Sequence, residues 1–168
     1  ANAWAASAAY ALASQASRVL MLGSGNIGSI GVFALHVDYS RALDKAGITP
    51  TFIFAGKHKI DGNPYEPLSD DAKSDEQATV DTYYRQFIRD VAQGRGLGTD
   101  WVADQMADGR MHTAGRAVQL KFADCTVFSL GEAVGQAATT TAGRLAAERR
   151  QFKLRELIDP GGKISKAR

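Results

Sequence analysis

The chain has 168 residues, of which 45% are hydrophobic, 23% charged and 8% aromatic, and this composition excludes a disordered, collagen-like or disulfide-scaffolded protein. The net charge is +2, and the single cysteine, Cys125, excludes an internal disulfide and a cysteine-rich metal site. No apolar run reaches the length of about 18 residues that a membrane-spanning helix needs, so no membrane span is expected.

The charge is unevenly distributed along the chain. Residues 1–143 carry a net charge of −3, whereas residues 144–168 carry +5. We therefore expect one domain over 1–143, followed by a basic helix end and tail over 144–168. Phe152 is the one aromatic residue in this basic segment, so no specific nucleic-acid site is predicted, and a solvated tail is the simpler interpretation.

The first half of the chain is expected to mix helices, short strands and loops. The alanine-rich segment 3–17 is typical of a buried helix, because alanine has the highest helix propensity. The patterns that follow predict strands over 18–22, 32–37 and 51–54, a glycine-rich loop over 23–31, a helix over 39–46 and a long Gly/Pro-rich loop over 55–69.

The second half is expected to be mainly helical. Apolar residues at helical spacing predict a long helix over 70–93, ended by the glycines of 94–96. Further elements are predicted as helices over 99–106, 113–120 and 129 to about 150, with a brief strand at 127–128. This order implies a layered α/β fold. Few strands serve many helices and no Met begins the chain, so we expect a piece of a longer polypeptide with further sheet before residue 1.

One candidate site is a dinucleotide-binding loop. Gly23, Gly25 and Gly28 match the spacing GxGxxG directly after a predicted strand, where glycines let the backbone approach a pyrophosphate. The next predicted strand ends without the acidic residue that would hold a ribose, although Lys57 could suit a 2′-phosphate. The alternative is a glycine-rich turn without a ligand.

A second candidate is a serine nucleophile with a lysine base. Ser7 stands among alanines, which permit a tight strand-to-helix turn and a close approach of substrate. The histidines His36, His58 and His112 have no acidic companion in a convincing triad order. A lysine can replace histidine if burial favours its uncharged form, and Lys59 lies in the long Gly/Pro-rich loop. The alternatives are a helix serine and a solvated surface lysine.

Four stretches together resemble the signal peptide peptidase A (protease IV) family and its phage relatives, the capsid-assembly proteases. They are AASAAYALAS at 5–14, GNIGSIGV at 25–32, AGKHKIDGNPYEPLS at 55–69 and ADGRMHTAGRAVQLKFAD at 107–124. The resemblance implies a ClpP/crotonase-like fold, of which 1–143 would be the C-terminal part. The Ser7-Ala-Ala-Tyr10 segment is more similar to the phage branch than to the peptidase A branch.

The resemblance also implies a mechanism. Ser7 would attack the scissile carbonyl, Lys59 would be the general base, Ser29 would orient the lysine, and the backbone N–H of Ala8 would be one oxyanion donor. No cofactor and no metal are implied. The expected partners are a protein or peptide substrate, further copies of the same chain, and an N-terminal segment of the same fold that would supply the rest of the groove.

The function implied is a Ser-Lys endopeptidase that matures phage or prophage heads, in the cytoplasm or the procapsid. The alternative within the family is a signal-peptide-degrading peptidase at the membrane or in the periplasm. An inactive assembly module and the dinucleotide-binding domain are the alternatives from other classes.

Overall fold

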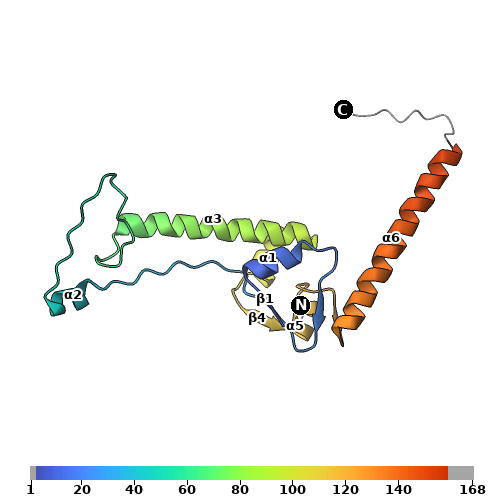
Figure 1. Cartoon of the computed structure of the whole chain (residues 1–168), viewed down its shortest axis with the longest axis horizontal. Coiled ribbons are helices and arrows are strands. Elements are labelled where there is room, and N and C mark those ends of the chain that lie inside the picture. Colours follow the sequence, from blue (N-terminus) through green and yellow to red (C-terminus); the bar gives the residue numbers. More distant parts are fainter. Residues whose placement is uncertain (1–2, 159–168) are drawn as a thin grey trace.

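The computed structural model describes residues 3–158, in which helices and short strands alternate along the chain (Figure 1). In chain order the elements are β1 (Trp4–Ala6), α1 (Ala8–Ser14), β2 (Leu20–Leu22), β3 (Asn26–Gly28), α2 (Ser40–Ala46), α3 (Asp70–Arg95), α4 (Thr99–Gln105), β4 (Met111–Thr113), α5 (Ala114–Gln119), β5 (Cys125–Val127) and α6 (Leu130–Ile158). This mixture confirms the expected α/β class.

Two small sheets organise the body of the molecule. In the first, β3 lies between β1, which is parallel to it, and β4, which is antiparallel to it. The register places Ala6 opposite Gly28 and Ile27 opposite His112. The second sheet pairs β2 with β5 in parallel. Parallel pairing of β1 with β3 brings the carboxyl ends of these strands to the same edge of the sheet.

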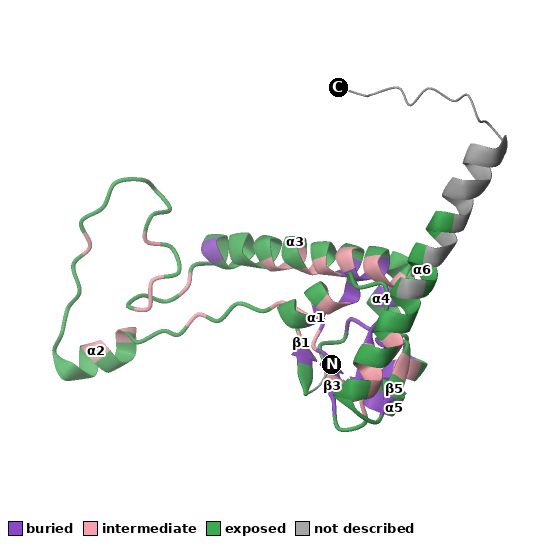
Figure 2. Ribbon diagram, turned by 45° about the vertical axis from the view of Figure 1, so that its right-hand side comes forward, coloured by how far each residue is buried: buried purple, intermediate pink, exposed green. Residues whose placement is uncertain are grey.

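The core lies between these sheets, α1, α5 and the second half of α3. Buried residues gather in this body, while most residues of the segment before α3, and most of those α6 residues whose burial is described, are exposed (Figure 2). Tyr10 and Phe122 are fully buried, their ring centroids are 5.1 Å apart, and the Tyr10 hydroxyl donates to the carbonyl oxygen of Phe122 at 3.2 Å. The chain therefore ties α1 to the segment before β5 with a satisfied polar contact inside an apolar core.

Helix α3 has well-formed ends. The Ser69 hydroxyl accepts a hydrogen bond from the N–H of Ala72 at 3.1 Å, and Gly96 ends the helix with a left-handed φ of 63°. Near this end, Arg95 donates to both carboxylate oxygens of Asp124, at 2.8 and 3.1 Å. This hydrogen bonding holds the pKa of the Asp124 carboxyl below its usual value. The ion pair thus fastens the end of α3 to the chain entering β5.

Helices α1 and α3 approach closely at Gly94. A Cβ atom at this position would overlap the carbonyl oxygen of Ser14, at the end of α1. We expect Gly94→Ala to lower the free energy of unfolding by about 1–3 kcal/mol, because backbone atoms must move apart. Helix propensity alone favours alanine by about 1 kcal/mol, so the sign of the change tests the packing. Urea denaturation checks this, with Gly115→Ala in α5 as control, since no atom lies within 4 Å of a Cβ there. An unchanged Gly94→Ala variant would contradict the close crossing.

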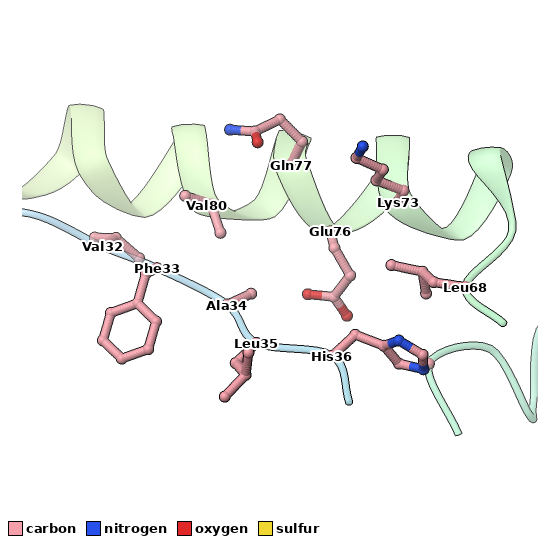
Figure 3. A pocket seen from close by; sticks show the side chains of 11 residues that line it. Val32, Phe33, Ala34, Leu35, His36, Leu68, Lys73, Glu76, Gln77 and Val80 are labelled. Atoms are coloured by element: carbon pink, nitrogen blue, oxygen red, sulfur yellow. The ribbon is translucent and has the colours of Figure 1, made fainter. Parts of the chain in front are cut away.

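A long arm, residues 31–69, leaves the body and returns to the start of α3 (Figure 1). It contains α2, but the strands predicted over 32–37 and 51–54 are wrong. Both segments carry strand-forming residues, yet neither finds a partner strand among the described residues. Figure 3 shows residues 32–36 running beside α3, with the side chains of Phe33 and Leu35 pointing away from the helix. A cavity of about 460 Å³ lies between residues 32–36 and α3.

Two other predictions were also wrong in part. The segment 3–17 is not one helix, because its first residues form β1 before α1 begins at Ala8. The glycine-rich segment 23–31 is not only a loop, because Asn26–Gly28 form the central strand of the first sheet. The predicted helix over 113–120 is confirmed as α5, preceded by the strand β4. In each missed strand, pairing with a distant segment overrides the local preference.

Helix α6 begins with a capping box. The Ser129 hydroxyl accepts from the N–H of Glu132 at 3.1 Å, and the Glu132 carboxylate accepts from the N–H of Phe128 at 2.8 Å. The helix extends to Ile158, past its predicted end near residue 150, and residues 159–168 of the expected tail lie outside the described residues. Among the described helices, none combines the length and apolar character needed to cross a membrane.

Candidate active site

Ser7 occupies a sharp turn between β1 and α1. Its φ of 53° and ψ of −124° are strained for a residue other than glycine. The turn is held by backbone hydrogen bonds: the N–H of Ser7 donates to the carbonyl of Gly28 at 2.9 Å, and the Ser7 carbonyl accepts from Tyr10 and Ala11. The side chain makes no capping bond and is exposed. A strained strand-to-helix turn that presents a free hydroxyl is the geometry of a nucleophilic serine.

Ser29 lies beside this turn. Ala6 and Gly28 are opposite each other in the β1–β3 register, so Ser7 and Ser29 both follow the carboxyl ends of neighbouring strands. Ser29 also has a positive φ, 56°, and its N–H donates to the carbonyl of Arg110 at 2.7 Å. Two strained serines therefore stand side by side at one edge of the sheet.

A single open groove of about 710 Å³ contains both serines. The residues that line it come from the α1 turn, the start of the arm, the middle of α3 and the turn before β4: Ser7, Ala8, Ala11, Ser29, Gly31, Val32, Phe33, Tyr83, Gln86, Phe87, Asp90 and Gly109. Most of them are small or apolar, so an extended peptide could approach the Ser7 hydroxyl closely.

The backbone N–H of Ala8 is available at this groove. Ala8 is the first residue of α1 and lines the groove. Its N–H finds no acceptor in the part of the chain that the structure describes, because the first turn of a helix leaves such groups unpaired. A free N–H next to a nucleophile is suited to bind an oxyanion.

Lys59 is not part of the groove. It lies exposed in a turn of the arm, where its backbone N–H donates to the carbonyl of Gly56 at 3.1 Å. Neighbouring residues of this turn form a pocket with Ser69 and Ala72 at the start of α3, whereas Ser7 faces the middle of that helix. At 1.5 Å per residue these places are roughly 20 Å apart along the helix axis. The structure brings Ser7, Ala8 and Ser29 together and leaves Lys59 away from them.

The geometry of the glycine motif is wrong for a dinucleotide. Gly25 precedes β3 and Gly28 ends it, so the segment pairs with neighbouring strands instead of opening a helix. Between residues 15 and 39, all of them described, no helix begins that could direct its N–H groups at a pyrophosphate. Lys57 lies in the distant arm turn. The motif instead places Ser29 beside Ser7.

His112 lies in β4, opposite Ile27 of β3, and does not line the groove. Its Nε2 atom is buried without a hydrogen-bond partner, and its ring packs on Phe122 with centroids 5.0 Å apart. Burial lowers the pKa of His112; the charge of Asp108 opposes the shift, and those of Arg110 and Arg116 add to it. The histidine is therefore partly buried against the core at Phe122, and the folded protein favours its neutral form.

The depressed pKa of His112 makes stability depend on pH. The unfolded chain takes up a proton on this histidine near pH 6.5, while the folded chain takes it up only at lower pH. The free energy of unfolding should therefore fall as pH decreases below about 6.5, by at most about 1.4 kcal/mol per pH unit for one proton. Urea denaturation over pH 5–8 measures the slope, and His112→Phe should flatten it. An equal slope in both proteins would contradict this assignment.

The sequence patterns missed the part of α3 that faces the groove. Apolar residues at helical spacing predicted one buried face, but the structure divides it. Ile88 and Val91 are buried in the core, whereas Tyr83 and Phe87 line the groove. The sequence does contain a second apolar row, Tyr83 and Phe87, displaced by one residue from the row that faces the core. Spacing alone, however, does not show which segment of the chain this second row faces.

Comparison with known proteins supplies the family. The family model for peptidase family S49 matches residues 1–143, most of the chain. The chain belongs to peptidase family S49. The resemblance deduced from the four stretches of sequence is thereby confirmed.

Relatives of both implied kinds match this S49 chain. It is 34% identical over 160 residues to capsid assembly protease C of Escherichia phage lambda. The matched region covers 95% of this chain and 33% of the relative. It is 44% identical over 101 residues to head-tail preconnector protein GP5 of Enterobacteria phage P21, covering 60% and 20%. A putative signal peptide peptidase SppA of Enterococcus faecium is 30% identical over 115 residues, covering 68% and 33%. The chain spans a third or less of the length of each relative.

Proposed function

We propose that this S49 chain carries the nucleophile of a serine endopeptidase that acts on proteins of an assembling phage head. The observation that carries the proposal is Ser7, which a strained turn presents to an open groove next to Ala8; within residues 3–158 neither the Ser7 hydroxyl nor the N–H of Ala8 has a hydrogen-bond partner. The phage relatives favour a head protein as the substrate, and a cytoplasmic or procapsid location follows from that. The ClpP/crotonase-like layering of the family is proposed with the function.

The proposed reaction is acyl transfer through Ser7. Its Oγ attacks the scissile carbonyl while Lys59 Nζ accepts the hydroxyl proton. The oxyanion is held by the N–H of Ala8, and the lysine then gives its proton to the departing amine. Water, deprotonated by the same amine, hydrolyses the ester and restores the serine. Ser29, beside Ser7 in the groove, would accept or donate a hydrogen bond that orients the lysine.

The placement of Lys59 supports a site shared between two copies of the chain. The arm that carries it exposes large apolar side chains that a solitary chain would leave in water: Phe33, Leu35, Val37, Ile48, Ile53 and Phe54. An exposed apolar segment of this size is typical of an interface. We therefore propose a homo-oligomer in which the arm of one copy covers the groove of the next, so that Lys59 approaches the neighbour's Ser7. An amine acts as a base only when uncharged, and burial under the arm would favour that form.

Mixing two inactive variants tests the shared site. Ser7→Ala and Lys59→Ala should each lack activity, because each removes one partner of every dyad. When the intact proteins are unfolded, mixed in equal amounts and refolded, about a quarter of the sites would combine both native residues in a closed ring or dimer. Cleavage of a phage scaffold protein at about a quarter of the native rate is the expected result.

Three other outcomes would contradict parts of the proposal. An inactive mixture would show that Ser7 and Lys59 act within one copy. An active Lys59→Ala protein would exclude this lysine as the base. A native protein that assembles but cleaves neither a scaffold protein nor a signal peptide would instead support the inactive assembly module. Cleavage of the signal peptide alone would favour the role of the Enterococcus faecium relative.

A further inference from the structure

One charged side chain faces the groove that contains Ser7. Among the groove-lining residues, all of which lie in the described part of the chain, Asp90 is the only one with a charge. It follows Tyr83 and Phe87 on the same row of α3, spaced four and three residues apart, so the carboxylate ends an apolar wall. A substrate that passes along this wall would meet aromatic rings first and a negative charge last.

Only one oxygen of the Asp90 carboxylate has a hydrogen-bond partner among the described residues. Its Oδ1 accepts a hydrogen bond from Gln86 Nε2 at 2.6 Å. No partner for Oδ2 is found within residues 3–158. Arg89, its neighbour in sequence, donates to Gln86 Oε1 at 2.6 Å instead of pairing with Asp90. One oxygen and the full negative charge therefore remain for a ligand.

The position of Asp90 is fixed relative to the nucleophile. Its backbone carbonyl accepts from Gln15 Nε2 at 2.8 Å, at the end of α1, the helix that Ser7 precedes. Gln86 also holds the carboxylate from one side. A charge that is anchored in this way selects a partner without a large loss of side-chain freedom.

We infer that Asp90 determines substrate specificity by selecting a lysine or arginine side chain near the scissile bond. The inference rests on the proposed peptidase function. The apolar wall would hold the stem of such a side chain while the carboxylate pairs with its charged end. A glutamate or aspartate at the same place would be repelled, which excludes acidic segments from cleavage.

The test compares matched peptides that differ in one charge. In a set of otherwise apolar peptides, a single Lys, Gln or Glu is placed at each position in turn, and kcat/KM for cleavage by the native protein is measured for every peptide. At one position kcat/KM should favour Lys over Gln by about tenfold, the effect of a charge-assisted hydrogen bond worth about 1.4 kcal/mol. Asp90→Asn keeps the acceptor for Gln86 and should cleave Lys and Gln peptides equally. Asp90→Lys should prefer Glu.

Asp81→Asn provides a matched control. Asp81 lies on the same helix and accepts from Gln77 Nε2 at 2.8 Å, four residues earlier, as Asp90 does from Gln86, but it does not line the groove. This variant should keep the native preference. Equal cleavage of Lys and Gln peptides at every position by the native protein would overturn the inference. An equal loss of kcat/KM for all peptides in Asp90→Asn would also overturn it, since Asp90 would then affect the catalytic dyad and not substrate choice.

A binding measurement separates this inference from the proposed function. The Ser7→Ala protein cannot turn peptides over, and their binding is followed by fluorescence anisotropy. The Lys peptide should bind about tenfold more tightly than the Gln peptide, and added salt should reduce the difference. Selective binding together with a native protein that cleaves nothing would retain Asp90 as a recognition residue and reject the peptidase. Cleavage without selective binding would reject the role of Asp90 alone.

Discussion

Replacement of Ser7 by alanine should abolish peptide cleavage, with kcat/KM falling by at least about a thousandfold. The variant removes the proposed nucleophile and nothing else, because the Ser7 hydroxyl makes no capping hydrogen bond and the backbone bonds of the turn involve its N–H and carbonyl groups. Stability should therefore change little. The measurement is cleavage of a scaffold protein, followed by mass spectrometry of the products, together with the thermal unfolding midpoint.

Ser24→Ala is the control for this prediction. Ser24 is an exposed serine of the turn between β2 and β3, outside the groove. It should retain full activity. If Ser7→Ala kept more than a few per cent of the native rate at unchanged stability, another residue would be the nucleophile and the strained turn would need a different explanation.

Replacement of Gly28 by alanine should damage both stability and activity. Gly28 ends β3 with a φ of 135°, which alanine rarely adopts, and a Cβ atom there would overlap the carbonyl oxygen of Arg110. That same carbonyl accepts the N–H of Ser29, and the Gly28 carbonyl accepts the N–H of Ser7. Backbone strain and the overlap should together lower the free energy of unfolding by about 2–4 kcal/mol. The shift of the two serines should reduce activity in the molecules that remain folded.

Gly23→Ala separates this effect from a general need for glycine in the motif. No atom lies within 4 Å of a Cβ at Gly23, and its φ is not positive, so this variant should stay near native stability and activity. Urea denaturation and peptide cleavage of both variants check the contrast. If Gly23→Ala were as damaging as Gly28→Ala, the loop would be under a constraint that the β3 pairing does not account for.

Helices were the part of the fold that could be predicted from the sequence. The long helix α3 has an apolar period and α6 begins with the capping pattern of Ser129 and Glu132, so each has a signal of its own. These signals are local, so the chain does not need to be folded for them to be recognised. The same is true of Gly96, whose left-handed φ ends α3 as expected.

Strands depended on partners that the sequence does not identify. The alanines of 3–17 favour a helix, yet Ala5 lies opposite Ile27 in the sheet, and the helix starts only after Ser7. Conversely, segments 32–37 and 51–54 have the residues of strands but lie unpaired on the arm. Strand formation is therefore decided by tertiary contacts more than by local preference.

The sequence indicated several residues of the candidate site but not how those residues are arranged in space. The alanines around Ser7 indicated a tight turn, and the structure places Ser29 and Ala8 at the same groove. The separation of Lys59 and the contribution of α3 could not be predicted, because both depend on how distant segments cross. The sequence-based interpretation of Gly23, Gly25 and Gly28 as a nucleotide loop failed for the same reason, since β3 is a strand only when β1 and β4 flank it.

The most direct test of the shared Ser-Lys site is the distance between Ser7 Oγ and Lys59 Nζ in a crystal structure of the assembled protein. A dyad shared between copies requires a separation of about 2.6–3.2 Å between the serine of one copy and the lysine of a neighbouring copy, with Ser29 beside both. Distances beyond about 8 Å for every pair of copies, on well-ordered segments, exceed any hydrogen bond and would contradict a Ser-Lys dyad.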